Sequence, residues 1–329
     1  MKHLLPKDTL FTAILTITLL LFGLQLKAQT DFEKADSIAA NFEEVCETPE
    51  DLAQKLTATL TTPEEKARVF YMWITHNIRY DCRQYHNPKP VTIKAATDED
   101  YDKKVAEWQK KQILKTIKFK KGICEDYSRL FKAMCEEVGL ESIVIQGDAR
   151  DFNRPYQSEH DNPHAWNSVK IGDTWHLLDA TWGAGKTNAE FTKFTREVST
   201  KLFFTPPALF IQDHFPKEAK WQLLNSPLSK EDFANQAAIN YANVNYSITD
   251  FAPQVEDQTG KKKTVWLQFE EIPKVIAIAN KKGKQIEFER VEQDGKLTLS
   301  FPASKARSIT IYGGKTYKNK LQWLAKYEL

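Results

Sequence analysis

The stretch from Lys121 to Trp182 constrains the fold more than any other part of the chain, because it places chemically reactive residues at the ends of expected elements. Cys124 is followed by apolar residues at the spacing of one buried helix face: Tyr127, Leu130, Phe131, Met134, Cys135 and Val138. Gly139 then fits the left-handed position at which helices stop. We therefore expect Cys124 in or just before the first turn of an amphipathic helix.

A cysteine at a helix start has two readings. Unpaired N–H groups and the helix dipole favour a thiolate there, and the same groups can later hold an oxyanion. Alternatively, Cys124 is an ordinary small buried residue, as cysteine often is. Cys135 lies within the apolar stripe of the same helix, and we expect it in the core.

Two strands joined by a tight turn are expected over residues 165–180. Gly172 and Asp173 separate two strand-like runs and favour a two-residue hairpin loop. This loop pairs Ile171 with Thr174. A three-residue loop would reverse which side chains share a face.

In the two-residue register, His164 and Asp179 lie on the same face of the hairpin, because Asp179 pairs with Trp166 and side chains alternate. Diagonal Cβ atoms lie within about 7–8 Å, so a carboxylate there can meet an imidazole nitrogen. His176 falls on the opposite face, where we expect a structural role. His160, in the polar loop before the first strand, is a weaker candidate for a base.

The three residues together predict a nucleophilic site. A thiol with an ordinary pKa near 8.5 is mostly protonated at pH 7, so it needs a histidine to take its proton and a carboxylate to orient that histidine. We assign Cys124 as the nucleophile, His164 as the base and Asp179 as its orienter. A lone histidine is more often a packed or solvated residue, but the order of the three residues favours catalysis.

The motifs around these residues resemble the transglutaminase-like superfamily: GICEDYS at Cys124, HAWN at His164 and LLDATW at Asp179. Residues 65–81 are similar to the helix that precedes the core in that family, and residues 203–224 resemble its kyphoscoliosis-peptidase branch, to which the chain is nearest. The resemblance covers roughly residues 50–226.

The resemblance implies an α+β fold: a papain-like or transglutaminase-like core, with N-terminal helices and a catalytic helix packed on an antiparallel sheet. It also implies a Cys-His-Asp triad at the three residues named above. The motifs do not separate peptidases, amide cross-linkers and inactive members. A second oxyanion donor cannot be chosen among Gln84, Trp108 and Gln112.

With 329 residues and 41% apolar composition, the chain can form two domains. We expect a catalytic domain over residues 29–226 and a small β-sandwich of immunoglobulin-like type over residues 227–329. The expected strands of the second domain are Val244–Phe251, Thr264–Phe269, Val275–Ala279, Gln285–Val291, Lys296–Phe301, Ser308–Tyr312 and Leu321–Tyr327. The net charge of +2 argues against a nucleic-acid partner.

The N-terminus has a basic start and an apolar run from Leu10 to Leu24, which is short for a membrane span. We expect a signal peptide over residues 1–28, cut after Ala28, and hence a periplasmic, cell-surface or extracellular protein. An uncleaved anchor is the alternative. If the chain is exported, Cys46 and Cys82 could form a disulfide, although two unpaired thiols are favoured.

Other motifs define the surroundings of the site. Thr48-Pro49 and the capping box that starts at Thr62 each predict a helix start. The lysine-rich helix expected over 99–117 is read as a solvated face, or alternatively as one border of a substrate cleft. Trp166 and Trp182 flank the triad in sequence and are expected either to pack or to hold substrate. No spacing typical of a metal site is present, and no cofactor is expected.

We therefore expect an exported cysteine enzyme that transfers an acyl group from an amide of a protein or peptide substrate through a thioester. Water is the default acceptor, which favours a peptidase or amidase, and export alone suggests a cell-wall peptide. The alternatives are a transglutaminase with an amine acceptor, and a non-catalytic envelope adaptor that retains the fold. The oligomeric state is left open.

Overall fold

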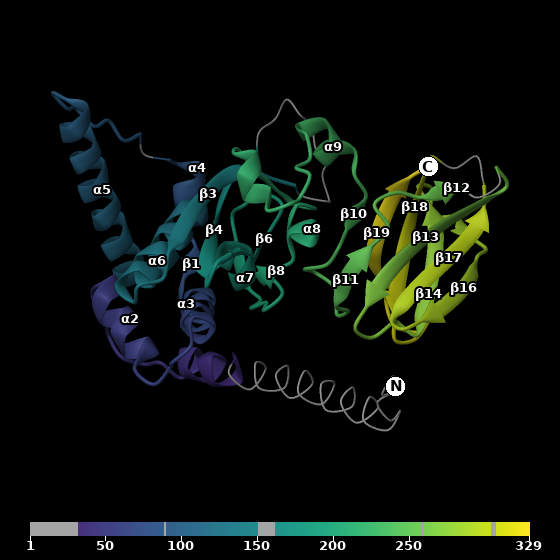
Figure 1. The fold of residues 1–329 in the computed structure, drawn as a ribbon, viewed down its shortest axis with the longest axis horizontal. Coiled ribbons are helices and arrows are strands. Elements are labelled where there is room, and N and C mark those ends of the chain that lie inside the picture. Colours follow the sequence, from purple (N-terminus) through teal and green to yellow (C-terminus); the bar gives the residue numbers. More distant parts are fainter. Residues whose placement is uncertain (1–31, 89, 151–161, 258–259, 304–306) are drawn as a thin grey trace, which may run out of the picture. The chain divides into compact units, whose positions relative to one another are not determined.

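The computed structural model describes residues 32–88, 90–150, 162–257, 260–303 and 307–329 (Figure 1). The expected signal peptide and His160 lie outside this part of the chain. These described residues divide into two compact units, the first within residues 32–141 and 187–198 and the second within residues 142–186 and 199–329. This division differs from the domain boundary expected at residue 227, which stays a prediction.

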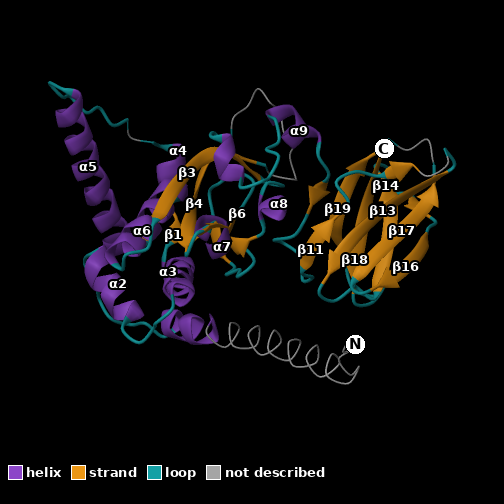
Figure 2. Ribbon diagram, in the orientation of Figure 1, coloured by secondary structure: helices purple, strands orange, loops and turns teal. Residues whose placement is uncertain are grey.

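Unit 1 is mainly helical (Figure 2). A helical segment at residues 32–40 is followed by α2 (Pro49–Thr57), α3 (Pro63–Asn77), α4 (Cys82–His86), α5 (Asp98–Phe119) and α6 (Cys124–Glu137). The expected helix starts are confirmed: Thr48 Oγ1 accepts from the N–H of Asp51 at 3.2 Å, and Thr62 and Glu65 form a reciprocal capping box.

Helix α6 forms the centre of unit 1 and packs against α2, α3 and α5. Its stripe is buried as expected from Tyr127 to Cys135, while Val138 is half-buried, and Gly139 adopts a positive φ of 75° just after the helix ends. The Tyr127 hydroxyl donates to the carbonyl of Ile78 at 2.8 Å and so ties α6 to the end of α3. Cys135 is fully buried, which confirms its place in the core.

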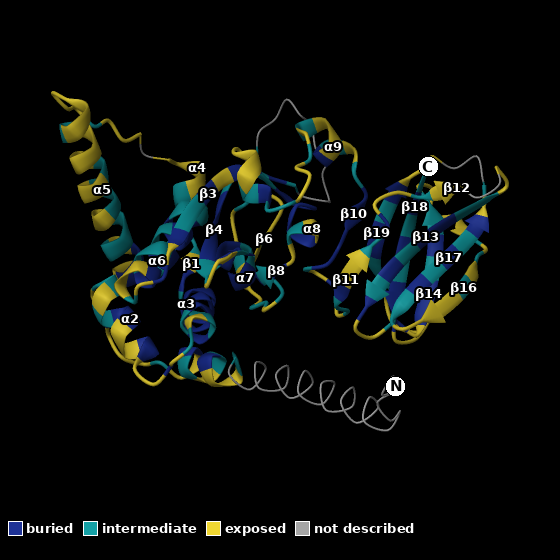
Figure 3. Ribbon diagram, in the orientation of Figure 1, coloured by how far each residue is buried: buried dark blue, intermediate teal, exposed yellow. Residues whose placement is uncertain are grey.

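Helix α5 is largely exposed, in agreement with the solvated-face reading (Figure 3). Within this helix, which the structure describes in full, only Thr116 and Ile117 are buried. Trp108 on this helix packs under the Arg129 guanidinium of α6, with 5.1 Å from Arg129 Cζ to the ring centre. In the described part of the chain, no helix combines the length and apolar character needed to cross a membrane.

Unit 2 contains a five-stranded antiparallel sheet in the order β8-β5-β4-β3-β9. Its strands are β3 (Ser142–Ala149), β4 (Pro163–Ile171), β5 (Thr174–Leu178), β8 (Phe203–Thr205) and β9 (His214–Pro216). Ile171 pairs with Thr174 across the turn, and Gly172 has a φ of 57°. The two-residue hairpin register is therefore confirmed.

Two further sheets in unit 2 form the β-rich C-terminal part of the chain. One has the order β10-β19-β18-β14-β15, and the other has the order β11-β13-β17-β16 with β12 beside β13. Their strands are β10 (Ala238–Ile239), β11 (Ile248–Phe251), β12 (Glu256–Asp257), β13 (Lys262–Phe269), β14 (Val275–Asn280), β15 (Gln285–Ile286), β16 (Glu289–Gln293), β17 (Lys296–Pro302), β18 (Ser308–Gly314) and β19 (Gln322–Glu328).

The two sheets bury alternate side chains against each other as a sandwich. Buried and partly buried residues alternate along β17 and β18, and the Tyr327 hydroxyl of β19 donates to the carbonyl of Ala252 beside β11 at 3.0 Å. The single strand expected over Gln285–Val291 is wrong, because β15 and β16 belong to different sheets. The fold is α+β with a core and a β-sandwich, as expected, while its immunoglobulin-like type stays a prediction.

The remaining elements are short and mostly connect the strands. They are β1 (Arg79–Tyr80), β2 (Lys121–Gly122), α7 (Ala180–Ala184), β6 (Gly185–Thr187), β7 (Phe194–Arg196), α8 (Pro207–Phe210), the 3-10 helix η1 (Ala219–Gln222) and α9 (Lys230–Asn235). Strands β1 and β2 form a parallel pair in unit 1, which holds the chain just before Cys124.

Candidate active site

Cys124 is the first residue of α6, as the sequence predicts. Its N-cap residue, Ile123, offers no side-chain cap. Instead, Asp126 Oδ2 accepts from the N–H of Ile123 at 3.0 Å. Gly122 makes this approach possible, since a Cβ added there would lie 2.5 Å from the Cβ of Asp126. The partly exposed Cys124 thiol therefore stands at a helix start that a buried carboxylate holds in place.

Gln84 of α4 is tied to this helix start, although no sequence signal assigned it there. Its Nε2 donates to the same Asp126 Oδ2 at 3.0 Å. Burial raises the pKa of Asp126, and the hydrogen bonds from Ile123 and Gln84 oppose that rise. Gln84 thus supports the loop that carries Cys124, whereas Trp108 and Gln112 lie along α5.

Tyr80 is a second neighbour of the nucleophile end in unit 1. Burial, and next a negative charge on Cys124, raise the pKa of the Tyr80 hydroxyl well above its ordinary value. Tyr80 pairs with Gly122 across the β1–β2 ladder, which brings it into this neighbourhood.

In unit 2, His164 of β4 and Asp179 form the expected hydrogen bond. Nε2 of His164 lies 2.8 Å from Oδ2 of Asp179. Only 8% of the His164 side chain and 1% of the Asp179 side chain are exposed. The hairpin register thus brings these two residues together, as predicted from the sequence. Cys124 belongs to unit 1, whereas His164 and Asp179 belong to unit 2.

Asp179 is held as an anion by donors on both oxygens. Oδ1 accepts from the backbone N–H groups of Thr181 at 2.7 Å and Trp182 at 3.1 Å, since Asp179 is the N-cap of α7. Burial disfavours the charge, but the His164 ring and a second histidine outweigh it and hold the pKa of Asp179 well below its usual range.

That second histidine, His214, was missed by sequence reasoning. Its Nε2 lies 3.1 Å from the same Oδ2 of Asp179, and its Nδ1 lies 2.5 Å from Oδ1 of Asp213. The Tyr241 hydroxyl donates to this Asp213 oxygen at 2.9 Å. The run QDHFP within residues 203–224 contained both residues, but it carried no spacing that links them to Asp179.

His164, Asp179 and His214 also form a compact group of possible metal ligands, with one ligand atom of each within 4.8 Å of the others. The sequence predicted no metal site, because these residues are far apart in the chain. In the structure the group is joined by the hydrogen bonds given above.

Trp166 and Trp182 surround the histidines. Trp166 is 1% exposed and packs edge-on to His214, with ring centres 5.0 Å apart. Trp182 is half-buried and lies against His164 and His214, at 5.4 Å and 4.8 Å between ring centres. The packing role fits Trp166, and substrate binding stays a prediction for both residues.

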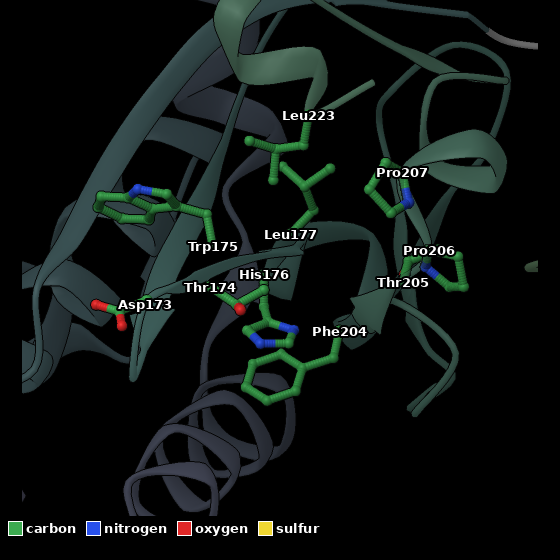
Figure 4. A pocket seen from close by; sticks show the side chains of 10 residues that line it. All are labelled: Asp173, Thr174, Trp175, His176, Leu177, Phe204, Thr205, Pro206, Pro207 and Leu223. Carbon is green, nitrogen blue, oxygen red and sulfur yellow. The ribbon is translucent and has the colours of Figure 1, made fainter. Parts of the chain in front are cut away.

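His176 lies on the opposite face of the hairpin, as expected. Its ring stacks on Phe204 with 4.4 Å between centres, and both line a pocket of about 450 Å³ together with Trp175 and Pro207 (Figure 4). This pocket contains none of the three predicted catalytic residues.

None of the four cysteines, Cys46, Cys82, Cys124 and Cys135, forms a disulfide in the structure, which agrees with the favoured expectation of two separate thiols at Cys46 and Cys82. Burial, with a contribution from Asp51, raises the pKa of Cys46 to about 11. Burial also raises the pKa of Cys82. These thiols therefore provide internal references for the reactivity of Cys124.

Comparisons with known proteins show what the chain is similar to. The sequence profile described as "Transglutaminase-like superfamily" matches residues 50–180. Kyphoscoliosis peptidase of Mus musculus is 34% identical over 211 residues, which are 62% of this chain and 28% of that protein. Hillarin of Drosophila melanogaster is 27% identical over 221 residues, which are 62% of this chain and 24% of that protein.

The chain thus spans about a quarter of the length of these curated relatives. Among solved structures, a TGase is 14% identical and covers 52% of this chain and 35% of that chain, with a TM-score of 0.27. The profile and the curated relatives, together with the α+β fold, confirm the predicted resemblance and support a family of cysteine-dependent enzymes. Residues 50–180 match the model of the transglutaminase-like superfamily, and the chain resembles the kyphoscoliosis-peptidase branch of that superfamily.

Proposed function

We propose that this chain is an exported cysteine-dependent enzyme that transfers acyl groups from amide bonds, with hydrolysis as its reaction. The observation that carries the proposal is the buried hydrogen bond between His164 Nε2 and Asp179 Oδ2. This contact is the base–orienter half of a nucleophilic triad, and it occurs in a chain whose family includes cysteine enzymes.

The hydrogen bond supports a separate role for each of the two imidazole nitrogens. When the neutral His164 ring donates through Nε2 to Asp179, Nδ1 is the basic nitrogen. In the proposal, Nδ1 takes the proton of the Cys124 thiol. The resulting imidazolium then stabilises the thiolate, as does the start of α6.

In the first half of the reaction, the Cys124 thiolate attacks the carbonyl carbon of a peptide or protein amide. The C–N bond breaks, His164 donates its proton to the departing amine, and a thioester on Cys124 remains. In the second half, His164 takes a proton from water, the hydroxide attacks the thioester, and the C–S bond breaks. His164 then returns its proton to the departing Cys124 thiolate, so a carboxylic acid is released and the thiol is restored.

The first test is the rate of iodoacetamide alkylation against pH, resolved by mass spectrometry at each cysteine. We expect Cys124 to react rapidly well below pH 7, while Cys46 and Cys82 react only in alkaline solution. His164→Ala should slow Cys124 at low pH, whereas His176→Ala, which changes the other hairpin histidine, should not. If the alkylation rate of Cys124 rises only near the ordinary pKa of a thiol and is the same in His164→Ala, catalysis would be refuted and the non-catalytic adaptor favoured.

A second experiment separates the two enzymatic alternatives. The purified full chain is incubated with a glutamine-containing peptide mixture, with and without a primary amine, and the products are analysed by mass. Cleavage or deamidation with no amine adduct supports hydrolysis. Amine adducts that vanish in Cys124→Ala would instead identify a transglutaminase. Loss of muropeptide cleavage in the same variant would extend the proposal to cell-wall peptides.

A further inference from the structure

His214 is a fully buried histidine with a carboxylate at each ring nitrogen. The distances are 3.1 Å from Nε2 to Asp179 Oδ2 and 2.5 Å from Nδ1 to Asp213 Oδ1. The His214 side chain is 0% exposed, and those of Asp179 and Asp213 are 1% and 2% exposed. The mechanism proposed above leaves this histidine without a role.

The proton inventory of this group assigns charges. Asp213 Oδ1 accepts from the Tyr241 hydroxyl at 2.9 Å, and Asp179 Oδ2 accepts from His164 Nε2 in the mechanism above, so the oxygen that faces each ring nitrogen of His214 is an acceptor. An acceptor oxygen needs a donor opposite it, and both ring nitrogens of His214 therefore donate. A histidine that donates from both nitrogens is an imidazolium.

The surroundings of the ring agree with this charge. The titratable groups around the ring are Asp213, Asp179 and His164, and Tyr241 hydrogen-bonds to Asp213. The remaining neighbours are the aromatic rings of Trp166, Trp182 and Phe210. Burial disfavours the cation, but Asp213 and then Asp179 outweigh this effect and raise the pKa of His214.

We propose that His214 is a positioning residue of the site: as an imidazolium between Asp179 and Asp213, it orients the Asp179 carboxylate and offsets part of its charge, so that Asp179 attracts the His164 proton less strongly. Once His164 has also taken a proton, two cations share the anionic Oδ2 of Asp179. His164 releases a proton more readily than it would beside an uncompensated carboxylate, which suits a group that must both accept and donate protons. This role rests on the proposed function.

The test compares the His164 ring titration, followed by nuclear magnetic resonance of histidine-labelled full-length protein, in the wild type and His214→Gln. Glutamine keeps an N–H donor but removes the charge. Since the two rings are 5.6 Å apart, we expect the His164 midpoint to rise by about one to two pH units, the size of a unit-charge effect at an effective dielectric constant near 20. An unchanged midpoint would overturn the proposal.

Tyr241→Phe is the matched control, because it removes one donor to Asp213 and leaves the His214 charge in place. We expect it to move the His164 midpoint far less than His214→Gln does. Equal shifts in the two variants would mean that the effect is merely structural and would also overturn the proposal.

A measurement on the wild-type protein tests the charge of His214 without depending on whether a variant folds. The ring nitrogens of His214 should show the chemical shifts of an imidazolium at pH 7, and a neutral ring there would contradict the assignment. The experiment is repeated with Zn²⁺, since His164, Asp179 and His214 could hold a metal ion. Stoichiometric Zn²⁺ binding at pH 7 that removes the His214 proton would replace the imidazolium and overturn the proposal.

These readouts separate this inference from the proposed function. The His164 titration does not use Cys124, so a midpoint that moves in His214→Gln supports the charge effect even if Cys124 proves unreactive. Conversely, rapid Cys124 alkylation that depends on His164, together with an unmoved His164 midpoint, would keep the enzyme and remove the role of His214.

Discussion

His164 and His214 place their Nε2 atoms on one oxygen, Oδ2 of Asp179, at 2.8 Å and 3.1 Å. The sheet explains how they meet. Strand β3 lies between β4 and β9, and it pairs Gly147 with His164 and Ala149 with His214. Two histidines that are 50 positions apart in the chain therefore converge across a single strand on a carboxylate that the β4–β5 hairpin supplies.

Replacing Asp179 by asparagine should strongly destabilise the fold and change its response to acid. Removing one partner of a buried charged group typically costs about 3–5 kcal/mol. Because the folded-state pKa of Asp179 is depressed, its contribution is present above the unfolded pKa near 4 and is lost as pH falls through the folded value.

Urea unfolding from pH 7 down to pH 2 checks this prediction. The wild type should lose stability steeply below about pH 4. The unfolding free energy of Asp179→Asn should be lower than that of the wild type at pH 7 and should fall less on acidification. Asp51→Asn, which changes an exposed aspartate, is the control. Parallel curves for the wild type and Asp179→Asn would contradict the linkage.

His214 contributes in the opposite direction along the pH axis. Its folded-state pKa is raised, so its stabilisation is fully present below the unfolded pKa near 6.5 and is lost as pH rises through the folded value. The stability difference between wild type and His214→Gln, measured by urea unfolding, should therefore shrink in alkaline solution. A difference that grows above neutral pH would show that the ring is not an imidazolium.

Gly147→Ala should disrupt the strand that joins the two histidines. A Cβ there would lie 2.1 Å from the Phe215 carbonyl oxygen and 2.4 Å from Cη2 of Trp166. Backbone cannot yield cheaply, so we expect a loss of about 3 kcal/mol in unfolding free energy, at the upper end of overpacking effects. Gly139→Ala, where a Cβ meets nothing within 4 Å and only the positive φ is strained, should cost about 1 kcal/mol. Equal losses would refute the close-packing argument.

Gly122→Ala should affect the nucleophile end more than global stability. The added Cβ would lie 2.5 Å from Cβ of Asp126, which must then move away from the N–H of Ile123 and from Gln84. We expect destabilisation of about 1–3 kcal/mol and slower alkylation of Cys124. Gln84→Ala should slow Cys124 in the same direction with a smaller loss of stability. An unchanged Cys124 rate in both variants would mean that this carboxylate does not position the thiol.

The two tryptophans near the histidines should behave differently. Trp166→Ala removes a fully buried ring and should cost about 3–5 kcal/mol. Trp182→Ala removes a half-buried ring and should cost less, while raising KM if the ring holds substrate. Urea unfolding and steady-state kinetics on a cleaved peptide measure both effects. A larger stability loss for Trp182→Ala than for Trp166→Ala would reverse this division of roles.

Features set by neighbouring residues could be predicted from the sequence alone. The capping box of Thr62 and Glu65, the start of α6 at Cys124 and the Gly172-Asp173 hairpin depend on interactions within a few positions. The length of the hairpin loop also determines which side chains of the two strands share a face, and this places His164 and Asp179 on the same face. The family resemblance rested on these same motifs.

Other features of the site and fold depend on pairings between distant segments, and only the tertiary structure decided them. His214 reaches Asp179 because β9 pairs with β3, and Gln84 reaches Asp126 across 42 positions of the chain. The division of residues 285–293 between two sheets likewise depends on which strands they pair with. No local pattern encodes such contacts, because they arise when separate elements bury their apolar faces together and buried polar groups must then find partners.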